Sequence, residues 1–147
     1  MKNIILLIAG IVVTALLLTI PAQIFELFYY DTEFSNEMYN SHVYFTVALT
    51  VGASAWGLAA IFYYAINSVS FSRWYHWLIV LGASMAVSSV TSYIHITNVM
   101  EAMQIDFSIQ AFHFAIIVAA LTAALFAVAS FSIRWWSSNC RHTPFPE

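Results

Sequence analysis

Charged residues are scarce in this chain. Only 7% of its 147 residues are Asp, Glu, Lys or Arg, against 62% that are hydrophobic, and the mean hydropathy is +0.82. Soluble domains carry roughly a quarter charged residues. With only four basic residues, the chain can neutralise few phosphates, which excludes nucleic-acid binding. The composition therefore predicts a membrane protein with little room for a soluble domain.

Other residue types are also rare, and each absence excludes a class of chemistry. A single cysteine, Cys140, rules out an intramolecular disulfide and a thiol pair. The only lysine is Lys2 at the terminus, so no span can carry a retinal Schiff base. No HxxxH or HExxH pair is present, and no acid or oxyanion site can be assigned beside the serines near His95. These absences favour a protein that is not an enzyme.

Long hydrophobic runs dominate what is present. A bilayer core about 30 Å thick needs roughly 20 apolar residues per helix, and four segments qualify. We expect an all-α integral membrane protein, a single domain over 1–147 built as an antiparallel, up-down four-helix transmembrane bundle. Asp31 to Ser41 reads as an outer loop, with Asn40 or Ser41 capping the next helix. The predicted helices cover about 4–28, 43–66, 75–98 and 107–134, followed by a cytoplasmic tail over 135–147.

The few charges are segregated along the chain. All four basic residues lie at the termini or in the second connection, whereas six of the seven acids lie in the first and third connections. Short loops rich in Lys and Arg stay in the cytoplasm. The pattern predicts a bacterial-type inner membrane with both termini cytoplasmic. The residues concerned are Lys2, Arg73, Arg134 and Arg141, and Glu26, Asp31, Glu33, Glu37, Glu101 and Asp106.

Small residues recur at helical spacing in two of the predicted helices. Such residues let helices approach closely within lipid. We expect them to pack the helices of one chain together, in preference to dimerisation. The positions are the pairs Ala48/Gly52 and Ala53/Gly57, and the alanines 111, 115, 119, 123 and 127, with Gly52, Gly57, Ala115, Ala119 and Ala123 as the main packing residues.

A polar line follows one face of the hairpin between the third and fourth predicted helices. Residues equidistant from the turn should share a depth, which pairs His95 with His113, Asn98 with Gln110 and Glu101 with Asp106. The inner half of the third helix is apolar, so within one subunit the line indicates an outward-facing pocket or docking surface and no through pore. Its members are a hydroxyl line, Ser84, Ser88 and Thr91, and an outer polar cluster, His95, Asn98, Glu101, Asp106, Gln110 and His113.

Two functions remain open on this evidence. A chain this small is expected to act by assembly in the bilayer, as a homo-oligomeric pore or vestibule or as a subunit of a larger membrane complex. Its outer cluster would then bind an ion or a partner. The alternative is a copper- or zinc-binding redox or transport component. Imidazole suits both metals and thioethers favour Cu(I), and the ligands would be His42, His95 and His113.

Overall fold

The computed structural model describes residues 2–144, which form helices and contain no strand. Three helical segments are long and apolar enough to cross a membrane: Val43–Ile66, Trp74–Ala102 and Ser108–Trp136. A fourth apolar helix at the N-terminus is shorter. The elements in chain order are α1 (Lys2–Thr19), α2 (Pro21–Glu26), α3 (Thr32–Asn40), α4 (Val43–Ala60) with a π-helical turn (Ile61–Ile66), a 3₁₀ turn (Val69–Phe71), α5 (Trp74–Ala102), α6 (Ser108–Ile133) and a 3₁₀ turn (Arg134–Trp136).

The first helix is shorter than the predicted 4–28, because it ends before a proline. Ile20 adopts φ −129° and ψ 51°, and Pro21 then begins the short helix α2. A residue before proline is pushed out of the α region by the proline ring. The four long helices expected from the sequence are therefore three long ones and one of 18 residues.

The predicted outer loop between the first two spans contains a helix of its own. Asp31 caps α3, because its Oδ1 accepts the N–H of Phe34 at 3.1 Å while Ser35 Oγ accepts the N–H of Asp31 at 3.2 Å. Phe34 and Met38, one turn apart, are fully buried. The cap of α4 is His42, at φ 56°, and not Asn40 or Ser41.

The α5–α6 connection closes as a Schellman motif. The N–H of Ile105 donates to the carbonyl of Met100, and the N–H of Gln104 donates to that of Glu101. Gln104 has φ 60°, the left-handed conformation that this motif requires after a helix. The turn is tight, so α5 and α6 pack along each other.

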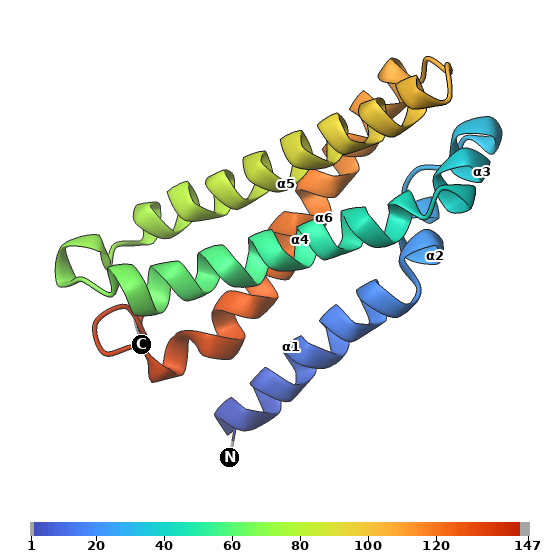
Figure 1. Ribbon diagram of the computed structural model, residues 1–147. Coiled ribbons are helices and arrows are strands. Elements are labelled where there is room, and N and C mark those ends of the chain that lie inside the picture. Colours follow the sequence, from blue (N-terminus) through green and yellow to red (C-terminus); the bar gives the residue numbers. More distant parts are fainter. Residues whose placement is uncertain (1, 145–147) are drawn as a thin grey trace.

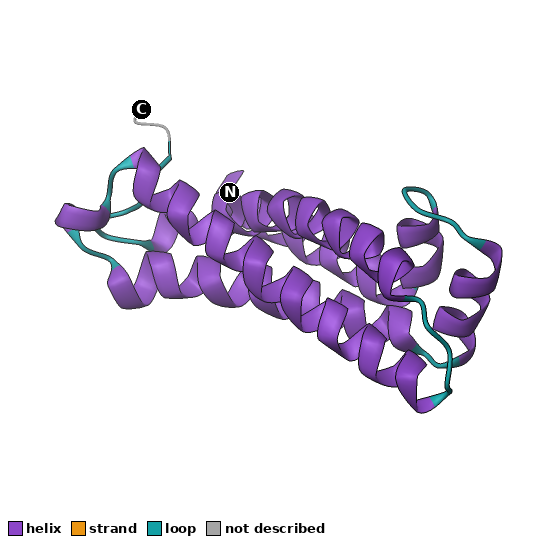
Figure 2. Cartoon of the chain, turned by 90° about the horizontal axis from the view of Figure 1, so that it is seen from above, coloured by secondary structure: helices purple, strands orange, loops and turns teal. Residues whose placement is uncertain are grey.

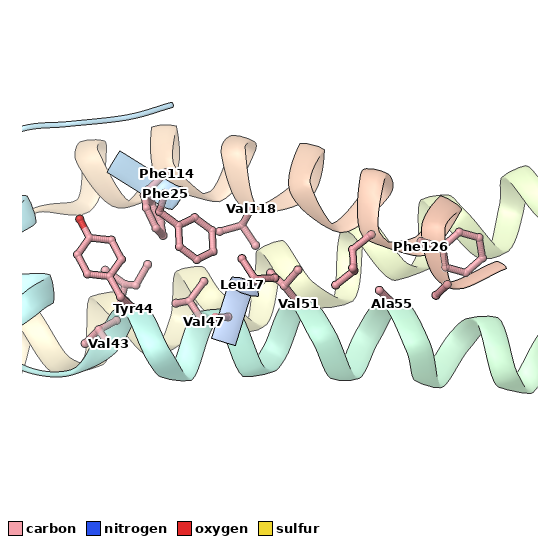
Figure 3. Packing of buried hydrophobic residues seen from close by; sticks show 14 of the residues in the cluster. Leu17, Phe25, Val43, Tyr44, Val47, Val51, Ala55, Phe114, Val118 and Phe126 are labelled. Carbon is pink, nitrogen blue, oxygen red and sulfur yellow. The ribbon is translucent and has the colours of Figure 1, made fainter. Parts of the chain in front are cut away.

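The helices form an elongated bundle in which α4 lies between α1 and α5 while α6 passes behind it (Figures 1 and 2). Both ends of the described chain point towards the end of the bundle that holds the α4–α5 connection, which we call the termini end. The opposite end, the α3 end, holds α2, α3 and the α5–α6 turn. There the ring of Phe114 in α6 contacts the rings of Phe25 and Tyr44, with 5.1 Å and 6.0 Å between the ring centroids (Figure 3).

Candidate functional site

The polar face of α5 is directed into the bundle, but it follows a different line from the predicted one. Ser84, Ser88 and Ser92 are buried, whereas Thr91 is exposed. The buried positions continue at steps of four through Ile96. At 3.6 residues per turn each such step rotates by about 40°, so the buried strip winds around α5. The predicted line followed one straight face of the helix, and it therefore included Thr91 instead of Ser92.

One hydroxyl pair joins α5 and α6. The Oγ of Ser88 and the Oγ1 of Thr122 are 2.6 Å apart, and the Thr122 hydroxyl donates to the carbonyl of Val118 at 2.7 Å. The hydroxyls of Ser84 and Ser92 are buried without a hydrogen-bond partner among residues 2–144. Polar groups buried in this way normally find a partner, so these two are the exceptions in the interface.

The Ser88–Thr122 pair also fixes which residues of the hairpin share a level. Counting seven residues towards the turn on each helix brings His95 level with Ala115. His113 lies two residues, or about 3 Å, nearer the turn. Its ring is 6.2 Å from that of Tyr29, in the α2–α3 connection. His113 thus contacts the α2–α3 connection, and no ring contact or hydrogen bond joins it to His95 within residues 2–144.

The outer polar cluster is spread over the surface of the α3 end. Asn98, Glu101, Asp106 and His113 are exposed, whereas His95 and Gln110 are half-buried. Among residues 2–144, no hydrogen bond joins two of the six. The Oδ1 of Asp106 accepts the N–H of the next helix's first residue, Ser108, at 3.1 Å, and this bond lowers the pKa of Asp106 below its ordinary 3.8. The cluster is therefore a surface, and the interior at this level is aromatic.

The predicted metal ligands are not assembled. No group of three or more His, Cys, Asp or Glu side chains within residues 2–144 is placed to hold a metal ion. His42 instead lines a cavity of about 220 Å³ together with Tyr39 and Tyr44. The Tyr44 hydroxyl is buried without a hydrogen-bond partner in the described chain. His42, His95 and His113 therefore do not form such a group in the part of the chain that the structure describes.

Comparisons with protein-family models, curated proteins and solved structures found no match.

The predicted packing residues divide between the interior and the surface. Gly52 is buried against Thr14 of α1, with 3.8 Å to its Cγ2 from a Cβ built on the glycine. Gly57 is exposed, and a Cβ built on it would meet nothing within 4 Å. On α6, Ala115 is buried whereas Ala119 and Ala123 are half-buried. The alanine row is thus buried at the α3 end and half-buried from Ala119 onwards.

The outward side of α4 carries a row that stays on one face, which we call the small-residue face. Its members are exposed or half-exposed, and their steps of 4, 3, 4 and 3 hold them on the same side of a helix. The spacing is legible in the sequence. Which side of α4 points outward became known only from the packing. The members are Thr46, Thr50, Ala53, Gly57 and Ala60.

The predicted cytoplasmic tail is docked on the α4–α5 connection as far as residue 144. Asn67 binds it through its side chain, donating to Ser138 Oγ at 2.9 Å and accepting from Ser137 Oγ at 2.8 Å. Thr143 Oγ1 donates to a backbone carbonyl of the same connection at 2.6 Å. Cys140 is fully buried, and burial raises the pKa of its thiol. Residues 145–147 lie outside the described residues.

Proposed function

We propose that this chain is a four-span membrane protein that acts non-enzymatically, by receiving another transmembrane helix on the small-residue face of α4. The observation that carries this proposal is the combination of heptad-like spacing, small side chains and open space over Gly57. Helices in lipid gain little from hydrophobic burial and associate through close packing, for which small residues are suited. A face of this kind, exposed within one chain, is the expected contact of an assembly.

The surroundings of the small-residue face support the same interpretation. The flanking helices expose branched side chains, with Ile8 and Val12 on α1 and Val87 and Ile94 on α5, and α4 itself exposes the larger Leu49 beside the row. In Figure 1 α4 lies between these two helices. A partner helix would therefore approach closely at α4 and be bordered by bulky residues on both sides.

The fourth span in this proposal is α1. Its 18 residues extend about 27 Å at 1.5 Å per residue, close to the roughly 30 Å of a bilayer core. It is tied to the bundle by two bonds: Ser132 Oγ donates to the carbonyl of Leu6 at 3.0 Å, and the Trp56 indole donates to Thr14 Oγ1 at 2.8 Å. The positive-inside rule then assigns both termini to the cytoplasm of a bacterial-type inner membrane.

The partner in this proposal is either a second copy of the chain or a helix of another membrane subunit. Exposed Asn98, Glu101 and Asp106 at the α3 end would meet the partner's extramembrane part or an ion. No metal is proposed, because the three histidines are not grouped.

Native mass spectrometry of the detergent-solubilised protein tests the assembly. We expect a homo-oligomer or a stoichiometric partner, and we expect Gly57→Leu to weaken the association about tenfold, which corresponds to about 1.4 kcal/mol. Gly82→Leu is the matched control. Gly82 is also an exposed helical glycine with nothing within 4 Å of a built Cβ, but it lies on α5.

Two results would overturn this proposal. A wild-type protein that is monomeric and co-purifies with no membrane partner would show that the chain does not act by assembly. Equal effects of the Gly57 and Gly82 variants, or a larger effect of the latter, would remove the assignment to α4.

A further inference from the structure

A cation without an ion-pair partner among residues 2–144 is enclosed at the termini end. Arg134 follows the last residue of α6 and keeps only 9% exposure. Its Nε and Nη1 are buried and have no hydrogen-bond partner within residues 2–144. The guanidinium lies 4.3 Å from the centre of the Trp135 ring and 5.0 Å from that of Phe131. A buried charge is costly unless it is paired and hydrogen-bonded, and aromatic faces supply only part of that compensation.

The carboxylates of the described residues lie at the other end of the bundle from this cation. Six of the seven acidic residues are in α2, α3, their connection or the α5–α6 hairpin end, all at the α3 end of the bundle. The seventh, Glu147, lies outside the described residues. The termini end instead adds exposed Arg73 and Arg141. An anion that reaches Arg134 would therefore meet a positive surface without a described competitor.

An apolar groove borders Phe131, one of the two rings in contact with this guanidinium. It lies between α1 and α6, has a volume of about 350 Å³ and shares Phe131 with the cation contact. Gly10 brings the two helices together there, because a Cβ on it would collide with Ser132 Oγ. The groove is lined by Leu6, Ala9, Gly10, Val13, Ala127 and Phe131 among others.

We propose that Arg134 and this groove bind one anionic phospholipid, with a phosphate oxygen at the guanidinium and an acyl chain between α1 and α6. Arginine binds phosphate through charge-assisted hydrogen bonds, and basic pockets between helices at the cytoplasmic surface are suited to anionic headgroups. Exposed Trp74 and Trp136 at the same end fit the aromatic belt of a membrane interface. The inference rests on the membrane placement proposed above but not on assembly through α4.

Native mass spectrometry of the full chain in detergent, titrated with phosphatidylglycerol or phosphatidylcholine, tests this site. We expect the wild type to retain one phosphatidylglycerol about tenfold more tightly than phosphatidylcholine, and Arg134→Gln to abolish that preference. Arg73→Gln is the matched control, since it removes the same charge at the same end from an exposed side chain. It should leave the preference unchanged within about twofold.

Further variants and competitors distinguish the contribution of the lipid headgroup from that of its acyl chain, and both from a loss of folding. Ala127→Phe, which fills the groove without changing charge, should weaken binding of both lipids several-fold. Inorganic phosphate at equal concentration should not compete. Arg134→Lys keeps the charge and should retain part of the preference, provided that circular dichroism shows wild-type helix content. Gly57→Leu should not alter lipid binding, so that failure of the assembly proposal and failure of this one are distinguishable.

Three outcomes would overturn the lipid site. The first is an equal loss of preference in Arg134→Gln and Arg73→Gln, which would indicate general surface charge. The second is the absence of any preference for phosphatidylglycerol in the wild type. The third is competition by inorganic phosphate, which would indicate an anion site without an acyl groove.

Discussion

At the scale of single residues, the hydroxyls of the α5–α6 interface differ in a way that can be measured. Ser84 and Ser88 are one turn apart on α5, and both are fully buried. Ser88 has the Thr122 hydroxyl at 2.6 Å, whereas the Ser84 hydroxyl has no partner in the described chain. Two serines that look equivalent in the sequence are thus expected to contribute with opposite sign to the free energy of unfolding.

We predict that Ser84→Ala leaves the free energy of unfolding unchanged or raises it, because it removes an unsatisfied buried hydroxyl. Ser88→Ala should lower it by about 0.5–1.5 kcal/mol, the usual net contribution of one hydrogen bond. Reversible unfolding in mixed detergent micelles, followed by circular dichroism, would measure both. A larger loss for Ser84→Ala than for Ser88→Ala would contradict this assignment.

At the scale of elements, the segment after α6 is fixed by one asparagine. Asn67, at φ 30°, holds Ser137 and Ser138 through its side chain and also accepts the backbone N–H of Asn139 at 3.0 Å. Asparagine tolerates the left-handed region better than most residues. The sequence predicted a tail at this position, and its polar residues gave no local signal of a docking partner some seventy residues earlier.

We predict that Asn67→Gly releases this segment and exposes Cys140. Glycine keeps the positive φ accessible, so the variant removes only the side-chain bonds. The rate of maleimide labelling of Cys140 should rise at least about tenfold, because a buried thiol with a raised pKa reacts slowly. Ser70→Ala, in the same connection but without a side-chain bond to the tail, should label at the wild-type rate. Equal rates in all three proteins would show that the tail is not held by Asn67.

At the scale of the whole molecule, basic and acidic residues are separated to opposite ends of the elongated bundle. Arg73, Arg134 and Arg141 lie at the termini end, and the six described acids lie at the α3 end. The three long apolar helices connect the two ends. In the orientation proposed above, the positive-inside rule places the basic termini end in the cytoplasm and the acidic α3 end outside.

We predict that, in a Cys140→Ser background, Asn36→Cys in α3 is labelled by a membrane-impermeant maleimide in intact cells. Ser70→Cys in the α4–α5 connection should be labelled only after permeabilisation. Both positions are exposed, so accessibility within the protein is matched. The reverse pattern would invert the topology and place Arg134 on the other side of the membrane.

The sequence by itself determined where the long helices run and how charge is divided between their ends. Both are local properties, since hydropathy and loop composition act within each segment. Only the tertiary structure decided which side of each helix is buried. The interface winds around α5, so that Ser92 is enclosed and Thr91 is not, and α4 leaves Gly57 outward while Gly52 meets Thr14. That choice depends on how the helices cross, because a strip of contact rotates along a helix wherever two axes are inclined. The docking of the tail on Asn67 and the enclosure of Arg134 arise in the same way, from segments that meet only after the bundle has formed.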